Sequence, residues 1–373
     1  MLISFPVEKR GAAMGIFGLV MILAPAIGTT LSGYIVEHYE WNVLFEMILP
    51  FALISLLLGV WKLENVLPNR KISIDYFSLV LSTIGFGALL YGFSSVSTAG
   101  WSDITVYGTI TVGAIGIALF IMRQFKLEEP LLDLSAYKFP MFALGSVISA
   151  ILSVAMFSGM ILTPAYVQNV RGISPFDAGL MMLPGAIVMG IMSPITGKLF
   201  DKFGPKILAA VGLLITAVST YFLTRLEVDS TYTYIISVYT IRMLGISLVM
   251  MPIMTNGLNA LPGRLNPHGT AINNTVSQVA GSIGTAVLVT VFNSHTKSRA
   301  AEIAADMKAN AGTTGVQPTE EQIAQMTQQV TQQALLDGIN FTFLVATGVT
   351  VVAFILAFFL KRSKQANEQS TKK

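Results

Sequence analysis

One arginine lies deep inside a long apolar run of this sequence. Arg242 follows the start of that run, near Tyr232, by about ten residues, which is roughly 15 Å along a helix. A charge at that depth in lipid costs about 2.5 to 3.5 kcal/mol, so the guanidinium must face protein partners. Those partners would belong to a substrate or proton pathway. The alternative is a purely structural bond to backbone carbonyls or to polar groups such as Asn273 and Gln278.

Three further side chains are candidates for the same pathway. Glu46 lies near the start of another apolar run, where an interfacial position is the alternative to a proton site. Met243 and Met250 lie on one helical face, because residues seven apart complete about two turns. Flexible thioethers suit a pocket that repacks around varied apolar ligands. Filling of the protein core is the alternative for both methionines.

A charged stretch, residues 197–206, separates two apolar runs and reads Gly-Lys-Leu-Phe-Asp-Lys-Phe-Gly-Pro-Lys. Pro205 favours the start of a helix. Beside that start the carboxylate of Asp201 can accept hydrogen bonds from free backbone N–H groups and pair with Lys202 or Lys206. We expect such a contact to act as a latch that stabilises one conformation. The alternative is a solvated aspartate in a turn.

Small residues recur every four positions in the first apolar run. Ala24, Gly28 and Ser32 form one face, and a small face permits close approach of a second helix. Pro25 removes one helical hydrogen bond and favours a bend. The pattern predicts a helix that packs tightly and flexes, with ordinary tight packing as the alternative.

The composition excludes a water-soluble globular protein. Of the 373 residues 53% are hydrophobic and only 12% are charged, whereas a soluble domain carries about 25% charged residues. The mean hydropathy is +0.67, so the chain must face lipid. The net charge of +3 is too small to indicate a nucleic-acid partner. The sequence contains no cysteine, which excludes thiolate metal sites.

Signatures of catalysis and of nucleotide binding are missing from the sequence. Gly197 and Lys198 are followed by Leu199 instead of the Ser or Thr of a phosphate-binding loop. The sequence has no nucleophile elbow and no zinc-protease motif, and its three histidines are scattered. We therefore expect neither enzymatic activity nor a cofactor, metal or nucleotide.

The apolar runs predict an all-α polytopic membrane protein, since a helix needs about 20 apolar residues to cross the hydrocarbon core. Ten windows meet this requirement: 11–36, 41–62, 75–98, 104–125, 142–167, 176–199, 206–226, 232–258, 268–292 and 338–360. Most of the 23 Lys and Arg residues fall on one side of the resulting topology, which predicts that both termini are cytoplasmic. The polar stretch 293–337 is then an extracellular loop, with a short amphipathic helix that begins at a capping box on Thr319.

Two of these segments resemble signatures of the major facilitator superfamily. The first run resembles the fifth-helix signature of its proton-coupled antiporters, at Gly15, Gly18, Ala24, Pro25, Gly28 and Gly33. The charged stretch resembles the conserved cytoplasmic loop of the superfamily, at Gly197, Asp201, Lys202, Gly204 and Lys206. Residues 177–185 and 274–285 are similar to the branch of drug:proton antiporters that has 14 helices.

The resemblance implies the major facilitator fold, with the ten spans as helices five to fourteen and the first four helices lacking. Residues 1–62 would then be a remnant of the N-terminal half, 63–138 two linking helices, 139–361 the six-helix C-terminal half and 362–373 a cytoplasmic tail.

The implied function is export of amphipathic or cationic drugs through the cell membrane by alternating access. Protons would be the second partner, and their gradient the energy source. A function of another class is the alternative: a non-transporting membrane protein, such as a pore, a scaffold or an inactive fragment of a transporter.

Overall fold

The computed structural model describes residues 24, 27–62, 75–127, 129–314 and 320–363. Within these ranges the secondary structure is entirely helical, which confirms the all-α class. Eight helices are long and apolar enough to cross a membrane. The long helices are α2 (Val43–Lys62), α3 (Tyr76–Ala99), α4 (Ile104–Gln124), α5 (Pro140–Asn169), α6 (Pro175–Phe222), α7 (Tyr232–Asn259), α8 (Asn266–Thr314) and α9 (Glu320–Ala357). Three short 3₁₀ helices, η2 (Leu134–Lys138), η3 (Leu223–Arg225) and η4 (Gly263–Leu265), lie between them.

Ten predicted windows appear as eight long helices for two reasons. Residues 27–38 are helical, but most of the first window lies outside the described residues. The windows 176–199 and 206–226 are the two limbs of α6, which meet at Gly204. Gly204 has φ 76° and ψ 176°, a left-handed conformation that glycine adopts without steric cost. Pro205 follows directly and cannot donate the hydrogen bond that would continue the helix.

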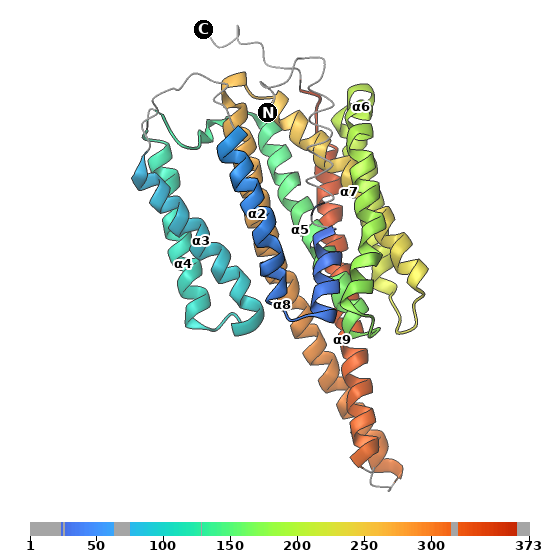
Figure 1. The fold of residues 1–373 in the computed structure, drawn as a ribbon. Coiled ribbons are helices and arrows are strands. Elements are labelled where there is room, and N and C mark those ends of the chain that lie inside the picture. Colours follow the sequence, from blue (N-terminus) through green and yellow to red (C-terminus); the bar gives the residue numbers. More distant parts are fainter. Residues whose placement is uncertain (1–23, 25–26, 63–74, 128, 315–319, 364–373) are drawn as a thin grey trace.

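The stretch 293–337, expected to be an extracellular loop with one short helix, contains far more helix than expected: its described residues, 293–314 and 320–337, are all helical. α8 contains 49 residues, which is about 73 Å of helix, more than twice the thickness of a hydrocarbon core. α8 and α9 therefore continue past the other helices as a helical hairpin, residues 293–314 and 320–337 (Figure 1). Arg299 of α8 joins the two arms of this hairpin by an ion pair with Asp337 of α9 at 3.1 Å, and it also pairs with Glu302 of its own helix at 2.6 Å. The stretch is rich in Ala and Gln, which favour helix even where the sequence is polar. Thr319 lies outside the described residues.

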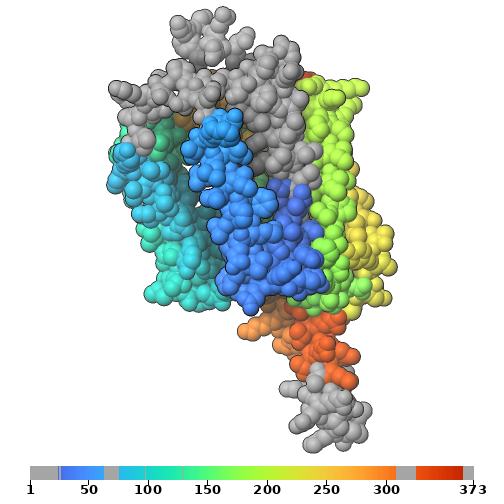
Figure 2. Space-filling model, in the orientation of Figure 1, coloured from blue at the N-terminus to red at the C-terminus, as the bar shows by residue number. Residues whose placement is uncertain are grey.

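The helices fall into a C-terminal bundle and a separate pair. α5 to α9 pack around shared cores, and α6 contacts α7 along much of its length. α3 and α4 pack chiefly on each other and touch the bundle through α8. α2 lies on the face seen in Figure 2, and none of its residues is buried. In the following, the C-terminal end is the end of the bundle that carries Leu360, and the hairpin end is the opposite one (Figure 1).

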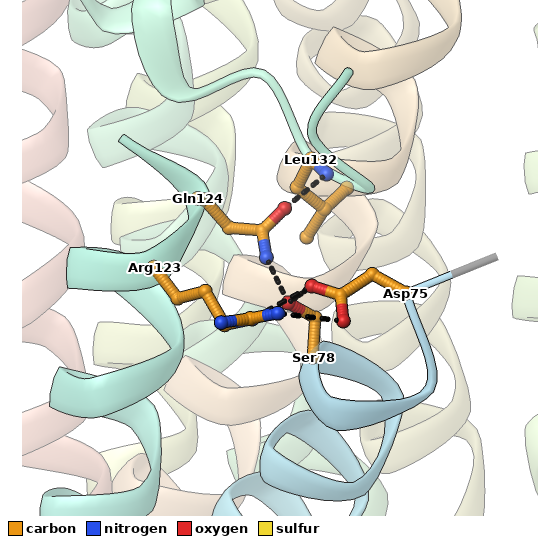
Figure 3. Close-up of polar contacts among 5 residues, drawn as sticks. All are labelled: Asp75, Ser78, Arg123, Gln124 and Leu132. Carbon is orange, nitrogen blue, oxygen red and sulfur yellow. Dashed lines mark hydrogen bonds and ion pairs between the residues drawn. The ribbon is translucent and has the colours of Figure 1, made fainter. Parts of the chain in front are cut away.

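A polar clasp closes the α3–α4 pair at the C-terminal end (Figure 3). The guanidinium of Arg123 donates to both carboxylate oxygens of Asp75, at 2.7 and 2.9 Å. Ser78 donates to the same carboxylate at 2.6 Å and accepts from the amide of Gln124 at 2.9 Å. Gln124 also accepts from the backbone N–H of Leu132 at 3.1 Å. The clasp thus joins the start of α3, the end of α4 and the chain that leads to α5.

The clasp has a defined response to acid. The hydrogen bonds from Arg123 and Ser78 hold the pKa of Asp75 well below its ordinary value of 3.8. A depressed carboxyl pKa stabilises the folded state at pH values above the ordinary pKa, and this stabilisation is lost as the pH falls towards the folded pKa. We expect Asp75→Asn to lower the melting temperature of the purified protein by a constant amount from neutral pH down to pH 3.8. Below that pH the difference from wild type should shrink. A difference that disappears well above pH 3.8 would contradict the role of the clasp.

Candidate functional site

Segment 27–38 and α6 touch backbone to backbone near the hairpin end. A Cβ atom added at Gly33 would lie 2.5 Å from the carbonyl oxygen of Pro175. A Cβ atom added at Gly179 would lie 2.7 Å from the Cα of Thr30. Such distances leave room for glycine alone. The first apolar run therefore makes a close contact with α6 through Thr30 and Gly33. The predicted face of Ala24, Gly28 and Ser32 does not make it, since Ala24 is exposed and a Cβ at Gly28 would meet no atom within 4 Å.

A cavity of about 600 Å³ lies beside this contact, between segment 27–38, α5 and α6. We call it the interface cavity. Its size is in the range of sites that hold small molecules. Most of its surface is apolar, and its polar side chains are Thr29, Ser32 and Gln168. The described lining consists of Gly28, Thr29, Ser32, Gly33, Val36, Met160, Pro164, Gln168, Pro175, Ala178, Gly179 and Met182.

The residues that α5 contributes to this lining were missed at the level of sequence. Pro164 lies inside α5 and Gln168 near its end. A proline inside a span was the signal used for Pro25, and the same signal at Pro164 would have indicated this wall. Among the residues of the antiporter-like signature, Gly28 and Gly33 line the cavity, whereas Ala24 is exposed. Gly15, Gly18 and Pro25 lie outside the described residues.

Arg242 is fully buried where α5, α6 and α7 meet. Its Nε donates to Thr220 Oγ1 at 3.0 Å, and its Nη2 donates to Ser158 Oγ at 3.2 Å and to the carbonyl oxygen of Ala155. Gly159 makes room for it, since a Cβ there would overlap the guanidinium. Within the described part of the chain it has no carboxylate partner. This geometry supports the structural alternative for Arg242.

The other pathway candidates do not gather around one space. Met243 is buried in the bundle core, whereas Met250 is 50% exposed. Asn273 is buried and Gln278 is exposed, and neither contacts the guanidinium of Arg242. Glu46 is exposed in the first turn of α2, in keeping with an interfacial position. None of these five is among the described residues that line the interface cavity.

The loop at 197–206 differs from the sequence-based expectation. The carboxylate of Asp201 is exposed and, among the described residues, pairs with neither Lys202 nor Lys206. The reason is that the first limb of α6 remains helical to residue 203, which leaves Asp201 on the helix surface. Its backbone carbonyl instead accepts from Arg362 at 2.9 Å. Gly197 lies on the first limb of α6, and Gly204 lies at the end of that limb.

Arg362 is held in place by a buried amide that sequence reasoning did not single out. Asn256 donates to the carbonyl of Lys361 at 3.1 Å and accepts from the N–H of Ser363 at 2.9 Å. Its side chain is fully buried at the end of α7. These bonds hold residues 361–363, which follow α9, and Arg362 among them reaches the first limb of α6 close to the break at Gly204.

The two glycines of segment 27–38 should respond differently to the same substitution. Gly33→Ala forces a methyl group against Pro175 and should destabilise the protein by about 1–3 kcal/mol. Gly28→Ala is the matched control, because a Cβ at Gly28 meets no atom within 4 Å. Melting temperatures of the purified variants check this expectation. Equal losses for both variants would show that the close contact does not carry stability.

A second pair of glycines tests the site of Arg242. Gly159→Ala should displace the buried guanidinium and cost about 1–3 kcal/mol. Gly348→Ala on α9 is the control, since no atom lies within 4 Å of its added Cβ. If Arg242→Met fully restores the stability of Gly159→Ala, the clash is confirmed as the cause. A loss in Gly159→Ala no larger than in the control would contradict it.

Comparison with known proteins supplies the family. A model of the Major Facilitator Superfamily matches residues 4–285. The chain is 41% identical to the uncharacterized MFS-type transporter YhcA of Bacillus subtilis (strain 168), over 100% of this chain and 73% of YhcA. It is 42% identical to the lincomycin resistance protein LmrB of the same organism, over 97% of this chain and 72% of LmrB.

A solved structure is similar in fold. It is a bacterial homolog of the human lysosomal transporter Spinster, in an inward-facing and occupied conformation. The TM-score is 0.51 and the identity 17%, over 97% of this chain and 72% of that chain. The family match and the long apolar helices agree, and the chain belongs to the Major Facilitator Superfamily of membrane transporters.

Proposed function

We propose that this chain exports amphipathic drugs from the cell in exchange for protons, by alternating access. The observation that carries the proposal is the interface cavity, which is large enough for a small molecule and lies beside the contact of Gly33 with Pro175. The drug-resistance name of LmrB supports the substrate class. The proton gradient would supply the energy, as the antiporter-like residues of the first run imply.

The geometry suggests how access would alternate. Gly33 and Gly179 let segment 27–38 and α6 close on each other at the hairpin end. A tilt of segment 27–38 away from α6 would open the interface cavity towards that end. The opposite tilt would open it towards the C-terminal end. In this scheme the bond from Arg362 to Asp201 is part of the latch, because it holds the break in α6 in one arrangement.

We further propose that the helices correspond to helices five to fourteen of a transporter with 14 helices. The alignment with YhcA covers this whole chain but 73% of YhcA, which supports the proposal. α2 has no buried residue, which also supports it, since further helices would find a free surface there. The C-terminal end would face the cytoplasm, where the Lys and Arg bias places it.

Export from drug-sensitive bacterial cells tests the proposal. The chain, preceded by the N-terminal helices of YhcA, should raise resistance to amphipathic antibiotics, and a protonophore should abolish the effect. Gly348→Ala, outside the described cavity lining and with no atom within 4 Å of its added Cβ, should keep this activity. Gly33→Val should abolish the resistance, because a valine side chain has no room against the backbone of Pro175.

Two outcomes would decide against parts of the proposal. Export that persists in the presence of the protonophore would contradict proton coupling. Membrane insertion without any export would favour the alternative of a pore, a scaffold or an inactive remnant.

A further inference from the structure

No predicted span of this sequence has an Asp or Glu residue near its middle. The chain has 20 Asp and Glu residues. The ten windows contain Glu46, Asp75 and Asp177, and each lies within the first six residues of its window. The one ionised side chain near the middle of a window is the cation Arg242. The interior of these spans therefore offers no negative charge.

The described lining of the interface cavity also contains no Asp or Glu residue. None of its described lining residues is ionisable. The nearest carboxylates along the chain belong to Glu37 and Asp177, which are exposed and lie outside the lining. Asp177 belongs to the first turn of α6, where its backbone carbonyl accepts from Tyr232. Among the described lining residues, Ser32 and Gln168 offer hydrogen-bonding groups to a molecule in the cavity, and none offers a counter-ion to a cation.

A buried positive charge lies behind the wall of this cavity. Arg242 binds Ala155 and Ser158 on α5, and Met160 of the same helix lines the cavity. Met182, another lining residue, packs into the core cluster that contains Met243, the neighbour of Arg242. In a low-dielectric interior a charge acts over longer distances than in water. An unpaired cation at this place makes the cavity unfavourable for a second cation.

We propose that the interface cavity binds uncharged amphipathic molecules and rejects permanent cations. The inference rests on the proposed export function and narrows its substrates, since sequence alone left amphipathic and cationic drugs open. A cation that enters this apolar cavity loses its hydration and gains no opposite charge from the described lining residues in return. An uncharged molecule loses much less, and Ser32 and Gln168 can satisfy its polar groups.

The absence of cysteine from the chain allows a test at the cavity itself. Ser32→Cys places a thiol in the lining, and its alkylation by N-ethylmaleimide is followed on the full chain in membrane vesicles. Uncharged chloramphenicol should slow the alkylation, and the permanent cation tetraphenylphosphonium should not. Thr98→Cys, on the exposed end of α3, is the control, and neither compound should protect it.

A designed carboxylate should reverse the selectivity. Gln168→Glu puts a negative charge in the lining at nearly unchanged volume. In this background tetraphenylphosphonium should protect Ser32→Cys, with an apparent affinity at least about tenfold higher than before. Gln168→Met is the matched neutral control and should gain no such protection. The comparison of the two compounds in the Ser32→Cys chain alone remains decisive if Gln168→Glu fails to fold.

Each outcome bears on the inference. Equal protection by both compounds, or protection by neither, overturns it. The alkylation needs no proton gradient and no transport. Selective protection without export in cells would therefore contradict the proposed function alone, whereas export together with equal protection would contradict only this inference.

Discussion

The whole bundle depends on close approach of helix backbones at glycine. Lipid tails are as apolar as leucine, so hydrophobic burial cannot drive helices together inside a membrane, and van der Waals packing must do so. Between α6 and α7 a Cβ at Gly212 would lie 2.7 Å from the carbonyl oxygen of Gly245. Within the separate pair, a Cβ at Gly113 would lie 2.5 Å from the backbone nitrogen of Leu89. The contact of Gly33 with α6 uses the same device, so the candidate site is built like the rest of the bundle.

The buried cation meets a second constraint, the satisfaction of polar groups without water, at Nε and Nη2, whereas its buried Nη1 has no hydrogen-bond partner among the described residues. Arg242 reaches a carbonyl and two hydroxyl groups, and through them it joins α5, α6 and α7. Gly159 provides the space, so the small residue and the charged one depend on each other. A guanidinium can be held this way because its donors point in several directions at fixed angles. A lysine at position 242 would offer donors from a single atom and could not join all three helices.

Sequence predicted the helices well, because span length and hydropathy are local properties. It did not predict which small residues touch a partner: Gly28 of the predicted small face meets no atom within 4 Å, whereas Gly33, one residue beyond that face, lies against Pro175. It also placed Asp201 in a pairing that the structure lacks, because the end of the first limb of α6 depends on the backbone angles of Gly204. Asn256 gave no signal, since its partners are backbone atoms more than 100 residues away. Contacts between distant parts of the chain were thus the part that local patterns could not supply.

The proposed alternating access would require one half to move as a unit against the other, and the hydrogen bonds of α5 to α9 would hold these helices together in such a movement. Arg242 ties α5, α6 and α7 near the middle of the bundle. At the C-terminal end, Asn256 and Arg362 tie α7 and α6 to the chain after α9. Directional hydrogen bonds at two levels resist sliding of these helices against one another. The surface that α6 turns to segment 27–38 makes backbone contacts at Gly179 and Pro175, and Phe176 beside them packs edge-on against Tyr34 of the segment. In the proposed cycle the movement would take place at this boundary, where the interface cavity lies.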